Sequence, residues 1–197
     1  MTKYILAGGN ERRSEAYGER LAREVCKGRM GPLKILSSFF ADPTPWQWEV
    51  RYRDWGPWFK QYFGSDVSYD YAQPETFSAQ VRASDVVYLH GGDNETIFSS
   101  LRAYADFEEM VQDKIVIGSS AGANYLSELY WTRSKRQVAH GSGILPLGVM
   151  VHYGSLNGGF PGDLPVDWSE ADTRMETALK AEPLYRIKEG GFIVITQ

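Results

Sequence analysis

Short apolar runs rich in β-branched residues alternate with amphipathic stretches along the first two thirds of the chain. The apolar runs predict strands at residues 3–7, 34–40, 66–71, 85–90 and 115–117. Apolar residues at helical spacing predict helices at residues 14–27, 46–63, 94–102 and 123–129. Strands that alternate with helices indicate an α/β fold, a three-layer sandwich with a mostly parallel sheet covered by helices on both faces.

The last third of the chain is less regular. Residues 148–153 predict a strand, and residues 169–180 predict a helix after a loop rich in Gly and Pro. Two further apolar runs, 184–188 and 192–195, flank the pair Gly190-Gly191 and predict a closing β-hairpin. No linker, internal repeat or low-complexity segment divides the chain, so we expect a single domain over residues 1–197.

The strand at 115–117 runs into Gly118-Ser-Ser-Ala-Gly122, which has the G-x-S-x-G form of a nucleophile elbow. In such an elbow a strand turns sharply into a helix and exposes the serine hydroxyl on the turn. Small residues flank the serine because backbone and side chains crowd there. The pattern predicts Ser120 as a nucleophile and the N–H of Ala121 as an oxyanion donor. An ordinary βα turn of small residues is the alternative.

A second turn of small residues, Gly91-Gly92-Asp93-Asn94, follows the apolar strand at 85–90. Active sites of parallel sheets gather at the carboxyl ends of the strands, where this turn and the elbow both fall. The N–H of Gly92 is therefore a candidate for a second oxyanion donor. A phosphate-binding turn is the rival interpretation, but the surrounding residues form neither G-x-G-x-x-G nor a Walker sequence.

Three histidines compete for the role of general base. His152 closes the apolar strand, whereas His140 is expected in a polar loop and His90 ends the strand before the glycine turn. The strand-end position, like that of the serine, favours His152. The acid that would orient it is less defined, since Glu128 is the only carboxylate between Ser120 and His152. Downstream alternatives are Asp163, Asp167, Glu170 and Glu189.

Composition restricts the classes of partner and cofactor. A hydrophobic fraction of 43% and a charged fraction of 23% are ordinary for a globular domain. No apolar run approaches membrane-spanning length and no signal-peptide pattern opens the chain, so we expect a cytoplasmic protein with no membrane partner. A net charge of −4 without a basic block argues against nucleic acid. The histidines lack metal-ligand spacing and there is one cysteine, so we expect no metal or other cofactor.

The segments Gly118-Ser-Ser-Ala-Gly-Ala-Asn124 and Leu89-His-Gly-Gly-Asp-Asn94, together with His152, resemble the peptidase E family of serine peptidases, which also includes cyanophycinases. The resemblance extends over most of the chain. It implies a fold similar to that of class I glutamine amidotransferases and hydrolysis of short peptides, Asp-Xaa dipeptides in the best-known members. It also implies Ser120 as nucleophile, His152 as base, and the amides of Gly92 and Ala121 as the oxyanion hole.

The chain departs from the family pattern at several points. An ungapped count from the elbow reaches Lys135 where peptidase E has its triad aspartate, so Glu128, a later acid or a Ser-His dyad are the alternatives. His152 follows Val151 in place of the usual proline. Residues 45–58 are unusually aromatic, and aromatic residues at helical spacing favour a core or a dimer face over a substrate wall. Within this segment, Gly56-Pro57 predicts a break or a kink.

Together these patterns predict a serine exopeptidase that acts on short peptides, with an N-terminal aspartate expected. Asn94 and Arg133 are the expected substrate-binding residues, because an acidic side chain is best recognised by an arginine. Further candidate cations are Arg51, Arg53 and Arg136. An amidotransferase-like enzyme would need a cysteine at the elbow, where this chain has Ser120. A family member without its acid would instead bind a ligand or a partner protein. A homodimer stays an open option.

Overall fold

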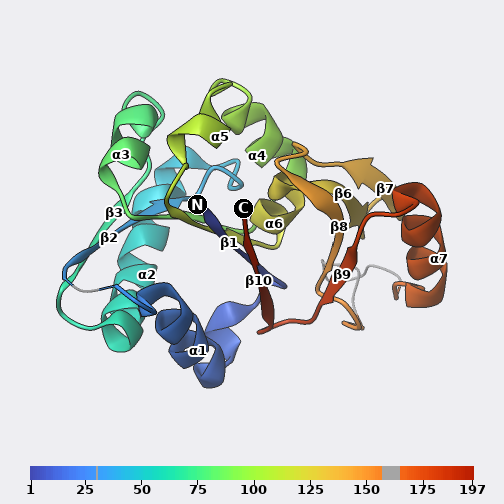
Figure 1. The fold of residues 1–197 in the computed structure, drawn as a ribbon, viewed down its shortest axis with the longest axis horizontal. Coiled ribbons are helices and arrows are strands. Elements are labelled where there is room, and N and C mark those ends of the chain that lie inside the picture. The colour runs from blue at the N-terminus through green and yellow to red at the C-terminus, as the bar shows by residue number, and fades with distance from the viewer. Residues whose placement is uncertain (30, 157–164) are drawn as a thin grey trace.

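The computed structural model describes residues 1–29, 31–156 and 165–197 (Figure 1). Its larger sheet has six strands in the order β10-β1-β5-β4-β2-β3. All neighbouring strands of this sheet are parallel except β10, which pairs antiparallel with β1. The strands are β1 (Lys3–Ala7), β2 (Leu33–Ser38), β3 (Val67–Tyr71), β4 (Val86–Leu89), β5 (Ile115–Ser119) and β10 (Phe192–Thr196). The central strands are buried along their length, as expected of a parallel sheet covered on both faces.

Helices cover both faces of this sheet. Alternate strand residues point to opposite sides, and the apolar ones on each side pack against a layer of helices. Ile5 of β1 packs with α1 (Glu15–Cys26) and α2 (Trp48–Phe63) on one face. Leu6 faces the other layer, where the helices are α3 (Phe77–Ala83), α4 (Asn94–Leu101), α5 (Phe107–Met110) and α6 (Ala121–Leu126). The prediction of a three-layer α/β sandwich with a mostly parallel sheet is confirmed.

A second sheet of four strands lies beside the first, in the order β7-β6-β8-β9 (Figure 1, right). Its strands are β6 (Ser127–Thr132), β7 (Gln137–His140), β8 (Leu145–Val151) and β9 (Leu184–Ile187). β8 runs parallel to β6 and β9, whereas β7 is antiparallel to β6. Helix α7 (Trp168–Leu179) packs its apolar side chains against Leu129, Trp131 and Met150 of this sheet.

Two predictions for the second half of the chain are wrong. The helix expected over 123–129 ends at Leu126, and the aromatic and β-branched residues that follow form β6. The runs at 184–188 and 192–195 do not form a hairpin, because β9 pairs with β8 and β10 pairs with β1. Each run completes the edge of a different sheet, and the turn at Glu189-Gly190-Gly191 carries the chain between them.

Gly56-Pro57 leaves open whether this segment forms one helix or two, and in the structure α2 is one helix that continues through Pro57. Two short 3-10 helices, η1 (Glu11–Arg13) and η2 (Pro45–Gln47), precede α1 and α2. The aromatic residues of α2 chiefly form core, since Trp48, Trp58 and Phe59 are buried. None of the helices in the described ranges has the length and apolar character needed to cross a bilayer.

The crossing of α6 over β4 requires glycine at position 122. A Cβ added to Gly122 would lie 2.2 Å from the carbonyl oxygen of Leu89. We expect Gly122→Ala to lower the free energy of unfolding by about 2–3 kcal/mol, since the backbone must shift to admit the methyl group. Urea denaturation followed by circular dichroism measures the change.

Gly56→Ala is the matched control. A Cβ at this position of α2 would lie 3.7 Å from the Tyr69 ring, an ordinary van der Waals contact. Alanine is favoured over glycine inside a helix, so this variant should keep or raise the free energy of unfolding by up to about 1 kcal/mol. If the two variants had equal free energies of unfolding, the prediction that a side chain at position 122 is sterically excluded would be wrong.

Candidate active site

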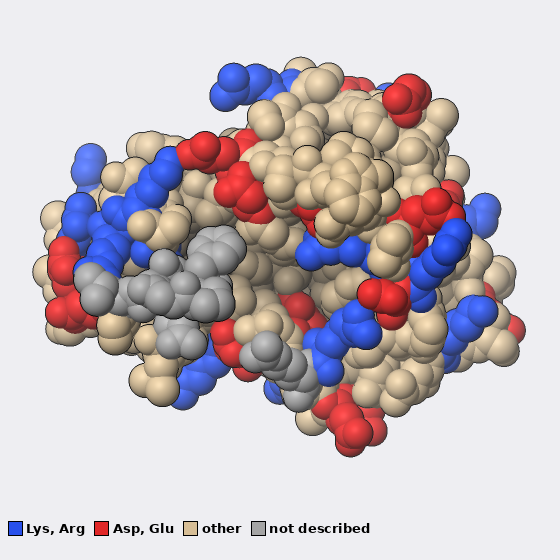
Figure 2. Space-filling model, turned by 180° about the vertical axis from the view of Figure 1, so that it is seen from behind, with Lys and Arg blue, Asp and Glu red and all other residues tan. Residues whose placement is uncertain are grey.

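A pocket of about 870 Å³ opens at the carboxyl ends of the parallel strands. The turns after β1, β2, β4 and β5 line it, together with α2 and the carboxyl ends of β6 and β8. Figure 2 shows this face of the molecule hollowed near its centre, with basic and acidic side chains around the hollow. The carboxyl edge of an open parallel sheet is where α/β proteins bind their ligands, so this pocket is the candidate active site.

Ser120 is the single residue between the end of β5 and the start of α6. Its backbone has φ 49° and ψ −108°, a conformation that L-residues rarely adopt and that marks a strained turn. The Ser120 amide donates to the carbonyl of Ala7 at 3.0 Å, and the Asn124 amide donates to the carbonyl of Ser120 at 3.0 Å. Strand β1 and helix α6 therefore hold the strained residue from both sides.

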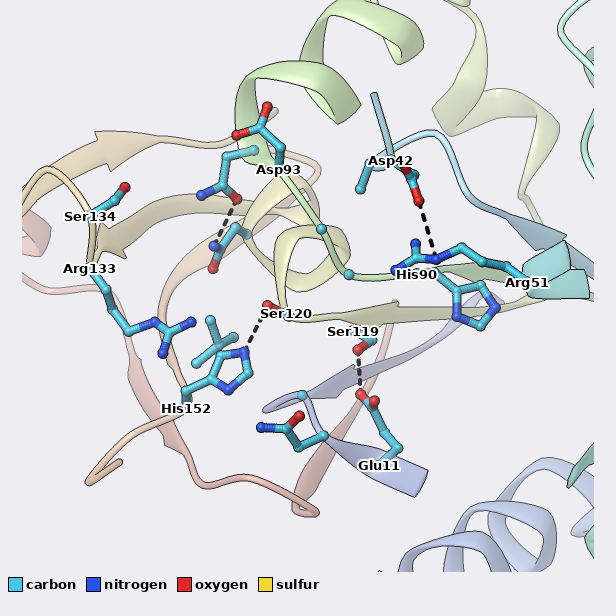
Figure 3. Close-up of a pocket in the computed structure, with 18 of the residues that line it drawn as sticks. Glu11, Asp42, Arg51, His90, Asp93, Ser119, Ser120, Arg133, Ser134 and His152 are labelled. Carbon is cyan, nitrogen blue, oxygen red and sulfur yellow. Dashed lines mark hydrogen bonds and ion pairs between the residues drawn. The ribbon is translucent and has the colours of Figure 1, made fainter. Parts of the chain in front are cut away.

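His152 follows the last residue of β8 and lies against the end of β1. Its amide donates to the carbonyl of Gly8 at 2.9 Å, and its own φ is 53°. Gly9 has φ 94°, and a Cβ there would lie 2.3 Å from Cε1 of the imidazole, so only glycine leaves room for the ring. The ring reaches Ser120, with 2.9 Å between Nε2 and the serine Oγ (Figure 3).

Glu189 contacts the other side of the same imidazole. Its Oε1 lies 2.9 Å from His152 Nδ1. The loop that carries it is fixed to β1, because Gly190 donates to the carbonyl of Gly9 at 2.9 Å and Gly8 donates to the carbonyl of Gly191 at 3.0 Å. Serine, histidine and carboxylate thus stand in series, the arrangement that activates a serine hydroxyl in hydrolases.

The carboxylate that contacts His152 is Glu189 and not Glu128, the acid expected from the sequence. Glu128 lies at the start of β6, where the preceding residue pairs with Leu145 at the start of β8, whereas His152 follows the end of β8. At about 3.3 Å per strand residue, the length of β8 separates Glu128 from the imidazole by roughly 20 Å. The Glu128 carboxylate lies near Glu182 instead.

The other downstream acids have different positions. Asp167 caps α7 by accepting from the amides of Ser169 and Glu170, each at 3.0 Å. Glu170 pairs with Arg174 along the same helix. Asp163 lies outside the described residues. Of these alternatives to Glu128, Glu189 is the one whose hydrogen bond to His152 the structure records.

The surroundings of His152 keep the imidazole neutral and select its tautomer. Burial lowers the pKa of His152, the nearby Arg133 guanidinium lowers it further, and the hydrogen bond to Glu189 opposes both effects. An ionised carboxylate only accepts hydrogen bonds, so the proton of neutral His152 lies on Nδ1. The lone pair of Nε2 is then directed at the Ser120 hydroxyl, as a general base requires.

The remaining histidines are not in contact with Ser120 in the described structure. His90 is buried, with its Nε2 3.0 Å from Ser37 Oγ and its ring stacked 4.2 Å from the ring of Tyr88. Burial holds the pKa of His90 well below its usual value, with Arg51 as a second cause. His140 is exposed on β7. The choice of His152 among the three agrees with this geometry.

The two residues whose amides are expected to form an oxyanion hole both lie near Ser120, one in the helix that follows it and one in the glycine turn after β4. Ala121 is the first residue of α6, so its N–H has no acceptor within the helix. The glycine turn lies directly against the elbow, since a Cβ on Gly91 would be 2.9 Å from Ser120 Cβ. Gly92 lines the pocket beside it. Their roles as oxyanion donors stay a prediction.

The expected substrate-binding residues both line the pocket. Asn94 accepts a hydrogen bond from Asn124 Nδ2 at 3.0 Å, and Arg133 follows the end of β6. Figure 3 shows Ser120 between Arg133 and His152 on one side and Arg51 and His90 on the other. Three arginines line the pocket, namely Arg12, Arg51 and Arg133.

The other basic candidates lie elsewhere. Arg53 pairs with Glu49 along α2, and Lys135 pairs with Glu95 on the surface. Arg136 donates to the carbonyl of Pro165 at 3.3 Å and does not line the pocket. Lys135, which stands where the family resemblance would place an acid, is therefore a surface residue.

Sequence reasoning missed several residues of the pocket. Glu11 and Arg12 follow β1, and Trp55 of α2 forms part of the wall beneath the Arg12 guanidinium, which lies 5.5 Å from its ring. One aromatic residue of α2 is thus a pocket wall, although core was the favoured interpretation. The position of Glu11 and Arg12 just after a parallel strand was the signal that could have found them. In the described part of the chain, no group of three or more His, Cys, Asp or Glu side chains is arranged to hold a metal ion.

Comparison with known proteins supports the fold. No family model matches the chain, and no curated protein matches it. A peptidase from an acI-B1 actinobacterium superposes with a TM-score of 0.58 at 18% identity, covering 100% of this chain and 88% of the other. A candidate peptidase E from Listeria monocytogenes EGD-e superposes with a TM-score of 0.61 at 12% identity, covering 100% and 99%.

The chain therefore has an α/β fold similar to that of class I glutamine amidotransferases, with Ser120 at the turn after β5. Within that class the chain has a peptidase E-like fold, as the resemblance in its sequence predicted.

The contact between Glu189 and His152 can be tested without any substrate. Glu189→Gln removes a negative charge beside the ring that raises the pKa of His152, so the pKa of His152 should fall. An NMR titration of the imidazole Cε1–H resonance measures it, with His152→Gln to assign the signal. Glu128→Gln is the matched control and should leave the resonance unchanged. Equal shifts in both variants, or none in Glu189→Gln, would contradict the assignment of the acid.

Proposed function

We propose that the chain is a serine peptidase that hydrolyses short peptides through an acyl-enzyme on Ser120. The observation that carries the proposal is the series of two contacts, 2.9 Å from Ser120 Oγ to His152 Nε2 and 2.9 Å from His152 Nδ1 to Glu189 Oε1. The strained backbone at Ser120 and the fold shared with structures named peptidases give further support.

In the acylation step, Ser120 Oγ attacks the carbonyl carbon of the scissile peptide bond while His152 Nε2 takes the hydroxyl proton. The carbonyl oxygen becomes an oxyanion, and the amides of Gly92 and Ala121 stabilise it. One such donor typically contributes about 10²–10³ in rate. Glu189 stabilises the imidazolium that forms. His152 then gives its proton to the leaving amine, and the peptide C–N bond breaks.

Deacylation repeats these steps with water. His152 Nε2 takes a proton from a water molecule, the hydroxide attacks the ester carbon, and the same amides hold the second oxyanion. When the intermediate collapses, His152 returns its proton to Ser120 Oγ and the acid product leaves. No co-reactant besides water is required.

The pocket favours a small, charged peptide as substrate. A volume of about 870 Å³ lies within the range of small-molecule sites, roughly 300–1,000 Å³. Arg51 and Arg133 offer guanidinium groups on the two sides of Ser120, which suit carboxylates. We therefore include in the proposal an exopeptidase preference for peptides with an N-terminal aspartate.

The rival hypothesis, a family member that has lost its acid and only binds a ligand or a partner protein, depended on the absence of a suitable carboxylate. Glu189 lies at hydrogen-bond distance from His152, which favours hydrolysis over this rival.

The role of Ser120 predicts a large loss of activity on its removal. Ser120→Ala should lower kcat/KM for dipeptides such as Asp-Leu by about 10⁴–10⁶, because no covalent intermediate can form. Release of free amino acid across a dipeptide panel measures this. A fluorophosphonate reagent should label wild type at Ser120, located by mass spectrometry of the digested protein.

Ser134→Ala is the matched control, since Ser134 also lines the pocket but has no contact with His152 in the described structure. It should keep labelling and most activity. Hydrolysis that survives in Ser120→Ala would contradict the proposal. A folded wild type that neither labels nor hydrolyses any dipeptide would favour the binding protein.

The environment of His152 predicts the acid limb of the pH profile. The base must be neutral, and the pKa of His152 is lowered from 6.5, so kcat/KM should reach half its plateau below pH 6.5. Arg133→Gln removes one cause of the lowering and should move this limb to higher pH. Arg53→Gln alters a surface arginine paired with Glu49 and should not move it. A shift to lower pH in Arg133→Gln would contradict the assignment.

A further inference from the structure

Glu11 is a residue of the pocket that the proposed reaction does not use. It is the first residue of η1, which follows the Gly8-Gly9-Asn10 turn at the end of β1. The side chain lines the pocket although the residue is only 5% exposed. Ser119 Oγ donates a hydrogen bond to its Oε1 (Figure 3). Glu11 therefore presents a nearly buried carboxyl group next to the residue that precedes the nucleophile.

Glu11 has hydrogen-bond donors but no cationic partner among the described side chains. Among the side chains described, no Lys, Arg or His forms an ion pair with it. Burial raises the pKa of Glu11, and hydrogen bonds from Ser119 and from the backbone of Glu11 and Gly9 offset part of that effect, whereas the nearby Glu189 adds to it. Desolvating an unpaired carboxylate is costly, and a cation that enters the site relieves the cost.

The other carboxylates of the pocket are already engaged. Asp42 lies 3.3 Å from Nε of Arg51, so it holds a cation of the protein itself. Asp93 caps α4 and accepts from the Thr96 amide at 2.8 Å. Glu11 is thus the pocket-lining carboxylate that is neither paired with a cation nor used to cap a helix in the described residues.

The position of Glu11 relative to Ser120 suits one part of a peptide. The α-nitrogen of an N-terminal residue is two bonds from the carbonyl carbon that the nucleophile attacks. Ser119, which donates to Glu11, is joined to Ser120, with about 3.8 Å between their Cα atoms. Glu11, Ser119 and Ser120 also line one and the same pocket, so a cation held by Glu11 would share that pocket with the attacked carbonyl.

We propose that Glu11 binds the free α-ammonium group of the peptide substrate, so that the enzyme acts on peptides with an unblocked N-terminus. This inference rests on the proposed peptidase function. The ammonium donates to the carboxylate, and Ser119 keeps the carboxylate turned toward it. Peptides with an acylated or missing α-amino group leave Glu11 buried and unpaired, and the site discriminates against them.

A purely structural role is the competing explanation, in which Glu11 only supports the elbow through Ser119. Two variants separate the roles. Glu11→Gln removes the charge but keeps an acceptor for Ser119, whereas Ser119→Ala removes the hydrogen bond and keeps the charge. Glu11→Asp, which draws the charge back by one methylene, serves as a second probe of the carboxylate.

The experiment compares Asp-Leu with succinyl-Leu, which is the same molecule without the α-amino group. Ala-Leu and propionyl-Leu form a second pair, so the result does not depend on a preference for aspartate. Wild type should prefer the amine-bearing member by about 10–100-fold in kcat/KM, as a charge-assisted hydrogen bond allows. The preference should vanish in Glu11→Gln, mainly through KM, shrink in Glu11→Asp and persist in Ser119→Ala.

The same pairs are also tested for binding, by calorimetry with the inactive Ser120→Ala protein and with Ser120→Ala/Glu11→Gln. The amine-bearing member should bind more tightly to the first protein, and the difference should disappear in the second. This readout needs no turnover, so it distinguishes the two proposals. Activity with no loss of amine preference in Glu11→Gln overturns the role of Glu11 and leaves the peptidase standing. Equal binding of both members to Ser120→Ala also overturns the role of Glu11.

Discussion

The carboxyl end of β1 is the constraint on which the rest of the site depends. Three consecutive carbonyls, those of Ala7, Gly8 and Gly9, accept hydrogen bonds from Ser120, His152 and Gly190. These donors belong to, or adjoin, the nucleophile, the base and the acid of the proposed reaction. One short segment of backbone therefore fixes the relative positions of three residues that are far apart in sequence, and it does so with groups that have no side-chain freedom.

This arrangement explains why the second sheet matters for chemistry. β8 delivers His152 and the end of β9 delivers Glu189, so both groups come from a sheet that does not contain the serine. The turn after β9 then crosses to β10, which pairs with β1. Pairing of β10 with β1 thus draws Glu189 toward the imidazole. Strain at Ser120 and His152 is tolerated because these backbone hydrogen bonds hold each residue in place.

The charged side chains that surround the pocket have different partners. Arg133 opposes protonation of His152 while Glu189 favours it, so the base stays neutral but is stabilised once it takes a proton. Asp42 holds Arg51 at the opposite wall. Glu11 is left as a buried carboxylate beside the elbow, and the peptide itself would complete its pairing. This distribution of charge would suit the small zwitterionic substrate of the proposed reaction.

Local sequence alone determined the α/β class and the first five strands, and it singled out Ser120 and His152 as candidates, because periodicity and strand-end glycines are signals carried by neighbouring residues. Only the tertiary structure decided the acid and the second sheet. Glu128 is close to Ser120 in sequence, yet the length of β8 separates it from His152. Glu189 is far from Ser120 in sequence, but it lies beside His152 because β9 pairs with β8 and β10 pairs with β1. The pairing partners of β9 and β10 depend on which sheet edges are open, and that is a property of the folded chain rather than of a short segment.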